Sequence, residues 1–275
     1  MNFEKWQALG NDYVIIEERD LPWNLTAARV RAICAPHTGV AADGVLLLSD
    51  SEPPYMRVFN PDGSEAEVSG NGARQAILYL YRKGYTGPIG TAAGELYPTI
   101  ASPTNCIVKM SPASLESEDF PSGPPDGGGE LKAGGRVWRF RHVQVGNPQC
   151  AVAVASEREL KEVDITRVGR EIERHQLFPN RTNVSWFTQL APGMIRARIF
   201  ERGVGETSAS GTGATGAAVA YVLDGGSSPV TVMLDGGELV VEVGEELEIS
   251  LTGWAVPVFR GTLADDFVEE LGASE

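Results

Sequence analysis

The chain contains two segments, far apart in the sequence, that repeat the same pattern of residues. RVFNPDGSEAEVSGNGARQA (residues 57–76) aligns without gaps on RIFERGVGETSASGTGATGA (residues 198–217), and eight aligned positions carry identical residues, among them Ser69 and Ser210. Each copy reads as an apolar strand, a polar loop that contains glycine, and a helix that begins at Ser-Gly-x-Gly-Ala. The repeat therefore predicts two domains of similar fold, each of which contributes one helix N-terminus.

A shorter echo lies upstream of each copy, where Gly10-Asn11 in LGNDYVI matches Gly146-Asn147 in VGNPQCAV. Helices are predicted after a Thr26 cap and over ITRVGREIERHQ. Short runs rich in Val, Ile and Tyr predict strands at 13–18, 44–50, 55–60, 105–110, 136–145 and 149–155, and a meander over 230–253. Because strands greatly outnumber helices, we expect each domain to be rich in sheet.

One segment has a biased composition and breaks this pattern. Residues 111–135 are rich in Pro, Gly, Ser and acidic residues. Such a composition has little apolar surface to bury. The segment is therefore predicted to be a flexible loop or linker near the middle of the chain.

Charge and cysteine content exclude several classes of protein. The 275 residues carry a formal charge of −14, from 37 acidic and 23 basic residues, whereas binding to nucleic acid or to an anionic membrane surface needs clustered Lys and Arg. The three cysteines, Cys34, Cys106 and Cys150, are widely spaced and predict buried thiols rather than disulfides or metal ligands. No signal peptide and no apolar run of the ~18 residues that span a membrane is visible. We therefore expect a cytoplasmic protein.

Two helix N-termini that share one small ligand would suit the movement of a proton between the two faces of a carbon atom. Backbone amides at a helix start bind an anion such as an α-carboxylate. Ser69 and Ser210 would then act as acid and base on opposite faces, with no cofactor. Glu65 and Glu206 each precede these serines by four residues and could take a proton through the hydroxyl. The alternative is that the serines are ordinary N-caps and the glutamates only favour the helix dipole.

The second copy also matches G-x-G-x-x-G, from Gly211 to Gly216. A dinucleotide-binding fingerprint of this kind needs a strand directly before it. About ten polar residues intervene here, and the first copy has Gln75 in place of the third glycine. A dinucleotide site is therefore not predicted.

Six longer motifs follow one another along the chain: LGNDYVI, GVAADG, FNPDGSEAEVSGNGAR, GNPQCAV, NRTNVSW and ERGVGETSASGTGA. Together they resemble the diaminopimelate epimerase family over essentially the whole length. The resemblance implies a cofactor-independent isomerase that interconverts LL- and meso-diaminopimelate in lysine and peptidoglycan precursor biosynthesis. It implies an α/β (α+β) fold with two pseudo-symmetric domains, each a barrel-like, mostly antiparallel sheet around a central helix, with the active site between them. The first expected domain comprises residues 1–113 and 258–275, and the second comprises residues 114–257. The expected assembly includes the possibility of a homodimer.

The resemblance also assigns binding roles to residues within these motifs. Side chains of one group would contact the polar ends of the substrate: Asn11, Asn60, Asn147 and Asn183. Glu201 and Arg202 would recognise the distal amino-acid head, which needs both acceptors and donors. Another group would clamp the reacting α-carboxylate through the backbone: Gly70, Asn71, Gly211 and Thr212. No metal site is implied.

The chain departs from the family at the two acid/base positions. The resemblance implies cysteines where the chain has Ser69 and Ser210. A thiol titrates near about 8.5 and a hydroxyl closer to water, at roughly 15.7, a gap worth on the order of 10 kcal/mol. A helix dipole offsets at most about 2 kcal/mol of this gap. Three interpretations therefore stay open: an epimerase or racemase that works with serines or whose serines were engineered, a related cofactor-free isomerase with a carboxylate base, and a catalytically impaired amino-acid-binding homologue.

Overall fold

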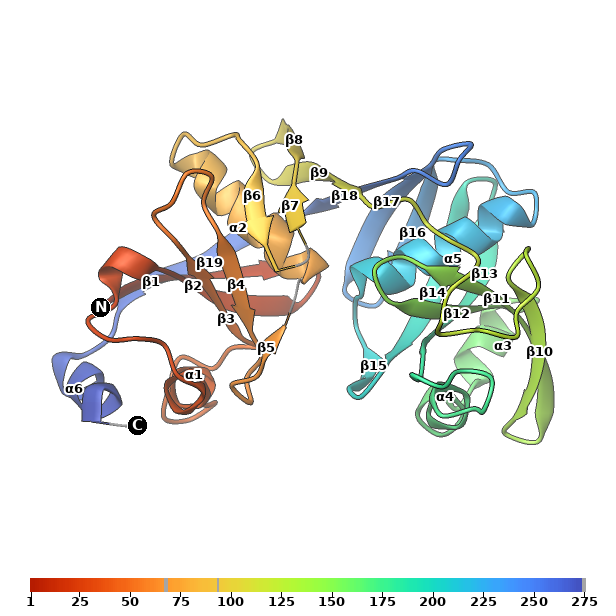
Figure 1. Cartoon of the computed structure of the whole chain (residues 1–275), viewed down its shortest axis with the longest axis horizontal. Helices are drawn as coiled ribbons and strands as arrows, with labels where there is room; N and C mark the ends of the chain where they lie inside the picture. Colours follow the sequence, from red (N-terminus) through yellow and green to blue (C-terminus); the bar gives the residue numbers. More distant parts are fainter. Residues whose placement is uncertain (67–68, 93, 274–275) are drawn as a thin grey trace. The chain divides into compact units, whose positions relative to one another are not determined.

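The computed structural model of the chain divides into two compact units (Figure 1). It describes residues 1–66, 69–92 and 94–273. The first unit comprises residues 1–108 and 253–275, and the second comprises residues 109–252. Both boundaries lie a few residues before the positions expected from the sequence, and the last two residues of the expected first domain lie outside the described part.

The first unit is built on a mixed sheet. Among the described residues its strand order is β19-β1-β2-β3-β4-β5, and neighbouring strands are antiparallel except for the parallel pair β2–β3. The C-terminal strand β19 returns to pair with β1. The elements of this unit are β1 (Asn2–Ala8), β2 (Asn11–Glu17), the 3-10 helix η1 (Glu18–Asp20), α1 (Ala27–Cys34), β3 (Val45–Leu48), β4 (Met56–Phe59), β5 (Glu65–Ala66), α2 (Gly70–Arg82), β6 (Ile89–Thr91), β7 (Gly94–Leu96), β8 (Pro98–Ser102), most of β9 (Asn105–Met110), β19 (Val256–Thr262) and α6 (Asp265–Ala273).

Helix α2 lies against this sheet because one of its faces is apolar. Ala73, Ala76 and Ile77 recur at helical spacing and are buried in one cluster with side chains of the strands, including Leu46. Gly72 lets the first turn approach the sheet, since a Cβ there would lie 3.0 Å from the Leu46 side chain. Packing of the helix therefore fixes the position of its N-terminus.

The second unit repeats this plan with more strands. Among the described residues its strands follow the order β10-β11-β12-β13-β14-β16-β17-β18, and β15 pairs with β14. The pairs β12–β13 and β14–β16 are parallel, and the others are antiparallel. The elements of this unit are β10 (Gly128–Ala133), β11 (Arg136–Gln144), β12 (Pro148–Ala153), α3 (Glu157–Glu162), α4 (Ile165–Glu173), β13 (Asn183–Ala191), β14 (Met194–Glu201), β15 (Gly205–Thr207), α5 (Gly211–Leu223), β16 (Val230–Leu234), β17 (Gly237–Val243) and most of β18 (Ile249–Trp254).

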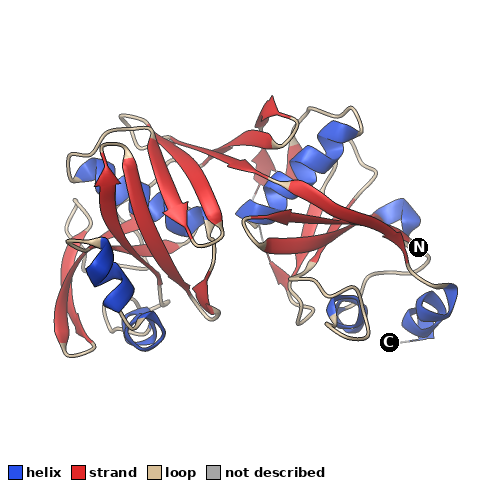
Figure 2. Cartoon of the chain, turned by 180° about the vertical axis from the view of Figure 1, so that it is seen from behind, coloured by secondary structure: helices blue, strands red, loops and turns tan. Residues whose placement is uncertain are grey.

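Helix α5 is the central helix of the second unit (Figures 1 and 2). Small and apolar residues lie on all of its sides, and Ala214, Ala217 and Val219 are fully buried. It contacts strands β11 to β14, β16 and β17. A Cβ at Gly213 would lie 2.7 Å from the Ile199 side chain, so the glycine permits close approach to β14. A helix that is apolar all round belongs in a core, as the predicted central helix requires.

The internal repeat extends to the topology of both units. In each, a hairpin is followed by a parallel pair, then by two antiparallel pairs and the long helix: β1-β2-β3-β4-β5-α2 corresponds to β11-β12-β13-β14-β15-α5. Gly10 and Gly146 occupy the two hairpin turns with φ of 82° and 83°, a region that glycine adopts readily. The predicted pseudo-symmetric mixed fold is therefore confirmed.

The prediction that residues 111–135 form a loop without apolar contacts is wrong. The segment ends in strand β10, where Leu131 and Ala133 alternate with exposed residues and are buried. Phe120 is also buried and packs against the rings of Phe140 and Phe178. Pro, Gly and acidic residues dominate the average composition, but a few well-placed apolar side chains are enough to anchor the segment to the core.

Candidate active site

Both predicted serines are N-caps of the long helices. Ser69 precedes α2 in an extended conformation and its Oγ accepts a hydrogen bond from the Gly72 amide at 3.0 Å. Ser210 precedes α5 in the same way and accepts from the Gly213 amide at 3.2 Å. The first amides of a helix have no partner within it, and the dipole is positive at this end. Each unit therefore has a helix start whose free amides and positive dipole end suit an anion, with a serine hydroxyl beside it.

The α2 site, defined here as Ser69, Gly70, Asn71 and the side chains that contact them, includes a tyrosine that the sequence did not indicate. The Tyr13 hydroxyl, from strand β2, donates a hydrogen bond to Ser69 Oγ at 3.2 Å. The ring is buried, and a Cβ at Gly44 would lie 2.6 Å from it. Gly44, the last residue of the GVAADG motif, therefore makes room for this ring.

A buried arginine supports the same helix start. Arg74 is fully buried and donates from Nη1 to the Gly70 carbonyl at 3.0 Å and from Nη2 to Asn71 Oδ1. Among the described residues no carboxylate pairs with it, and burial lowers the pKa of Arg74 to about 10. The aligned residue of the second copy, Thr215, donates to the Gly211 carbonyl at 2.8 Å. Both copies thus fix the carbonyl of the first helical glycine, but only the α2 site gains a positive charge.

The two predicted asparagines of the first unit lie in polar turns. Asn11 donates to the carboxylate of Asp43 at 3.1 Å, and its carbonyl accepts from the Gln75 side chain at 3.0 Å. Asn60 donates to Ser64 Oγ at 3.0 Å in the turn after β4. The Gln75 bond links Asn11 to helix α2, whereas no such link to the helix is seen for Asn60 in the described part.

The α5 site, defined as Ser210, Gly211, Thr212 and the side chains that contact Ser210, contains a carboxylate. Glu201, the last residue of β14, accepts hydrogen bonds from Ser210 and from Thr207, the latter at 2.8 Å. Burial raises the pKa of the Glu201 carboxyl above its ordinary value, and these two hydrogen bonds oppose the rise. A carboxylate of this kind, in contact with a serine hydroxyl, can accept the proton of that hydroxyl.

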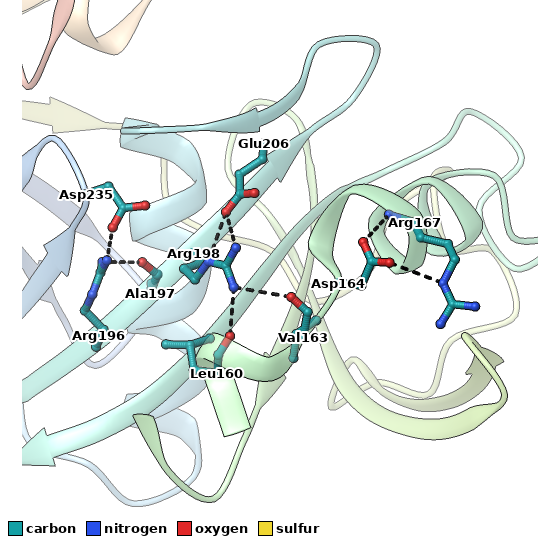
Figure 3. Close-up of polar contacts among 9 residues, drawn as sticks. All are labelled: Leu160, Val163, Asp164, Arg167, Arg196, Ala197, Arg198, Glu206 and Asp235. Carbon is teal, nitrogen blue, oxygen red and sulfur yellow. Dashed lines mark hydrogen bonds and ion pairs between the residues drawn. The ribbon is translucent and has the colours of Figure 1, made fainter. Parts of the chain in front are cut away.

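The glutamates predicted to assist the serines, Glu65 and Glu206, are engaged elsewhere. Arg57 donates from Nε and Nη2 to the two oxygens of Glu65, both at 2.8 Å. Arg198 donates from the same atoms to one oxygen of Glu206, at 2.9 and 2.6 Å, and also bonds two backbone carbonyls (Figure 3). The repeat preserves these glutamates as partners of its arginines. The carboxylate beside Ser210 is that of Glu201.

The remaining predicted residues of the second unit form a connected group at the start of β12 and β13. Asn147 accepts a hydrogen bond from Gln149 Nε2 at 2.6 Å. Asn183 is buried, and its Oδ1 accepts from the Arg202 amide at 2.8 Å. The Arg202 side chain is exposed and donates to the Asn180 carbonyl at 2.9 Å. Asn183 therefore fixes the backbone next to Glu201.

Two glutamines were not predicted as site residues. Gln75 and Gln149 are fully buried, and each donates from its amide nitrogen to a predicted asparagine, Asn11 or Asn147. Each Oε1 is buried without a hydrogen-bond partner among the described residues. An unsatisfied buried acceptor is costly, and a ligand ammonium group could supply the missing donor. Their positions next to the Gly-Asn motifs were the only signal in the sequence.

The sequence predictions also concern the cysteines and the possible metal ligands of the described residues. Cys34, Cys106 and Cys150 are free and buried, and burial raises their pKa values, to about 12 for the first two. In the described ranges, no cluster of three or more His, Cys, Asp or Glu could hold a metal ion. No helix in those ranges is both long enough and apolar enough to span a bilayer.

Comparison with known proteins identifies the family. Residues 3–116 and 141–258 match the model of the diaminopimelate epimerase family. A diaminopimelate epimerase from Synechococcus sp. is 38% identical over 281 residues, which cover 96% of this chain and 99% of the relative. One from Pelotomaculum thermopropionicum is 39% identical over 278 residues, covering 95% and 98%. This chain belongs to the diaminopimelate epimerase family. The two matched ranges include both Ser-Gly-x-Gly-Ala motifs, one in each unit.

Solved structures with the same fold have a much lower sequence identity to this chain. A probable proline racemase from Agrobacterium radiobacter, with bound carbonate, has a TM-score of 0.68 at 16% identity and covers 96% of this chain and 93% of its own. A putative phenazine biosynthesis PhzC/PhzF protein from Clostridium difficile has a TM-score of 0.68 at 12% identity, covering 96% and 99%. These likenesses establish the fold shared with the epimerase family.

Proposed function

We propose that this protein is a diaminopimelate epimerase that interconverts LL- and meso-diaminopimelate by moving the α-proton from one face of the carbon to the other. The observation that carries the proposal is the α5 site, where the Ser210 hydroxyl at a buried helix start bonds the carboxylate of Glu201. Relatives of nearly the same length that are named diaminopimelate epimerase support this substrate over other amino acids. Catalysis without a cofactor, a cytoplasmic location and a homodimeric assembly belong to the same proposal.

Substrate recognition is proposed to use both sites on one ligand. The amides of Gly70, Asn71, Gly211 and Thr212 would bind the reacting α-carboxylate at the two positive helix ends. Arg202 would recognise the distal amino-acid head, and the asparagine side chains of both units would contact the polar ends of the substrate: Asn11, Asn60, Asn147 and Asn183. Glu201, which the family resemblance assigns to the distal head, is assigned here to proton transfer because it contacts Ser210.

Proton abstraction through Ser210 avoids the high pKa of a bare hydroxyl. The α-proton passes to Ser210 Oγ while the Ser210 proton passes to the Glu201 carboxylate, so that no free alkoxide forms on this side. The electron pair of the broken C–H bond stays on the carbon. Glu201 is then the base, and its raised pKa brings it closer to that of the carbon acid. Ser69 would deliver a proton to the opposite face.

We expect calorimetry to detect binding of diaminopimelate without any added cofactor. Arg202→Ala is expected to weaken this binding about tenfold or more, because a charged donor to the distal carboxylate is lost. Arg174→Ala is the matched control, since Arg174 is likewise exposed and pairs with Glu173. Equal affinity of the parent and Arg202→Ala would refute the role of Arg202, and no binding by the parent would refute the substrate.

A further inference from the structure

We propose that Tyr13 is a positioning residue that fixes Ser69 as the proton donor of the pair, opposite Ser210 as the acceptor. The inference rests on the proposed function and deepens it. It assigns the donor role to one serine hydroxyl and the acceptor role to the other in the resting enzyme. The repeat by itself would make the two hydroxyl groups equivalent. The observation behind it is that the two serines have different hydrogen-bond partners.

The hydroxyl of Ser69 has both of its acceptor positions in use. A serine hydroxyl has one donor hydrogen and two lone pairs. The Gly72 amide and the Tyr13 hydroxyl each donate to Ser69 Oγ, at 3.0 and 3.2 Å. The remaining capacity of Ser69 is its own hydrogen, which is left to point away from these two donors. Toward a ligand, Ser69 is therefore a donor.

Ser210 has the opposite arrangement. Its Oγ accepts from the Gly213 amide at 3.2 Å, and its hydrogen is directed to the Glu201 carboxylate. The second lone pair of Ser210 is left for a ligand. A carboxylate can only accept when ionised, so Glu201 imposes this direction. Toward a ligand, Ser210 is therefore an acceptor.

The direction at Ser69 depends on a tyrosine that cannot turn away. Tyr13 is 5% exposed and belongs to the apolar cluster of the first unit, where it pairs with Trp6 across the β1–β2 hairpin. Gly44 packs against its ring, as described above, and the Val14 amide donates to the Gly44 carbonyl at 3.0 Å. Burial in this cluster and the close approach of Gly44 fix the ring, and with it the hydroxyl.

The same arrangement stabilises the product of proton donation. When Ser69 protonates the carbanion, the electron pair of the carbon forms the new C–H bond and the electron pair of the broken O–H bond stays on Ser69 Oγ. The hydrogen bonds from Tyr13 and from the Gly72 amide then end on a negatively charged oxygen, where they are stronger. Arg74, buried one turn along α2, adds a positive charge near this site.

The first test separates abstraction from delivery. In heavy water, Tyr13→Phe is expected to slow inversion of the isomer whose α-hydrogen faces Ser210 by about 10- to 100-fold, while exchange with retention continues through Ser210 and Glu201. Tyr79→Phe is the matched control, because this buried tyrosine bonds Glu17 instead. A purely structural role for Tyr13 would lower exchange and inversion together, and that outcome would overturn the proposal.

A second test does not depend on epimerase activity. The pH dependence of iodoacetamide alkylation gives the thiol pKa of Ser69→Cys and Ser210→Cys, because the native thiols are buried and have raised pKa values. Adding Tyr13→Phe to Ser69→Cys is expected to raise that pKa by about one unit, and adding Glu201→Gln to Ser210→Cys to lower it by about one unit. An unchanged pKa on adding Tyr13→Phe would overturn the proposal even in an active enzyme. The expected shifts in a protein that leaves diaminopimelate unchanged would uphold the polarity and refute only the proposed function.

Discussion

Replacing Ser69 and Ser210 together by cysteine is expected to raise α-proton exchange of diaminopimelate by several orders of magnitude. A thiol titrates about 7 units below a hydroxyl, and a helix N-terminus lowers the thiol pKa further. Glu201 compensates for the hydroxyl at Ser210, but no carboxylate among the described residues contacts Ser69 to let it act as a base. The gain is therefore expected to be greatest for the isomer whose hydrogen faces Ser69.

The measurement is the loss of the α-proton signal in heavy water, followed by NMR for each isomer and each variant. The single variants Ser69→Cys and Ser210→Cys are expected to gain much less in interconversion of the two isomers, because inversion needs one group on each face. If the double variant binds diaminopimelate yet exchanges no faster than the parent, the two serines do not occupy the chemical positions.

Glu201→Gln is expected to lower exchange through Ser210 by about 10²- to 10⁴-fold, the usual contribution of a general base. The amide retains the size and can still hydrogen-bond Thr207, but it cannot accept the proton of Ser210. The pH profile carries the same information. Glu201 accepts a proton only when ionised, so the rate is expected to fall as pH falls through its pKa. Burial raises that pKa, so the fall begins at a higher pH than for an ordinary glutamate.

Glu206→Gln is the matched control for this prediction. Glu206 lies in β15, the strand that pairs with the end of β14, and it pairs with Arg198, so its loss is expected to change the exchange rate little. A comparable loss in Glu206→Gln, or an unchanged acid limb of the profile in Glu201→Gln, would contradict the assignment of the base to Glu201.

The N-caps and the helix starts were predictable from the sequence because their signals are local. A serine followed by small residues specifies its own hydrogen bond to the amide three positions on, and the repeat shows the same solution twice. The repeat also predicted two units of similar fold, whereas the sheet around a central helix was implied by the resemblance to the family. The prediction of a flexible loop at 111–135 was wrong because composition does not reveal where a single residue such as Phe120 is buried.

The choice of the assisting carboxylate failed for a geometric reason. Glu206 and Thr207 are successive residues of β15, and successive side chains of a strand point to opposite faces. One face carries Arg198 and receives Glu206, while the other carries Glu201 and receives Thr207. Spacing from Ser210 favoured Glu206, but the pairing of β15 with β14 directs the Glu206 side chain to Arg198 instead. The contact of Tyr13 with Ser69 joins residues far apart in the chain, which no spacing rule could predict.

The most direct measurement is deuterium incorporation by the parent protein. LL- and meso-diaminopimelate are incubated separately with it in heavy water, without added cofactor, and both the α-deuterium content and the isomer ratio are followed. The account predicts that deuterium enters the α-carbon and that each isomer gives rise to the other. Binding of diaminopimelate with no deuterium in either isomer would contradict it, and the chain would then be a binder rather than an epimerase.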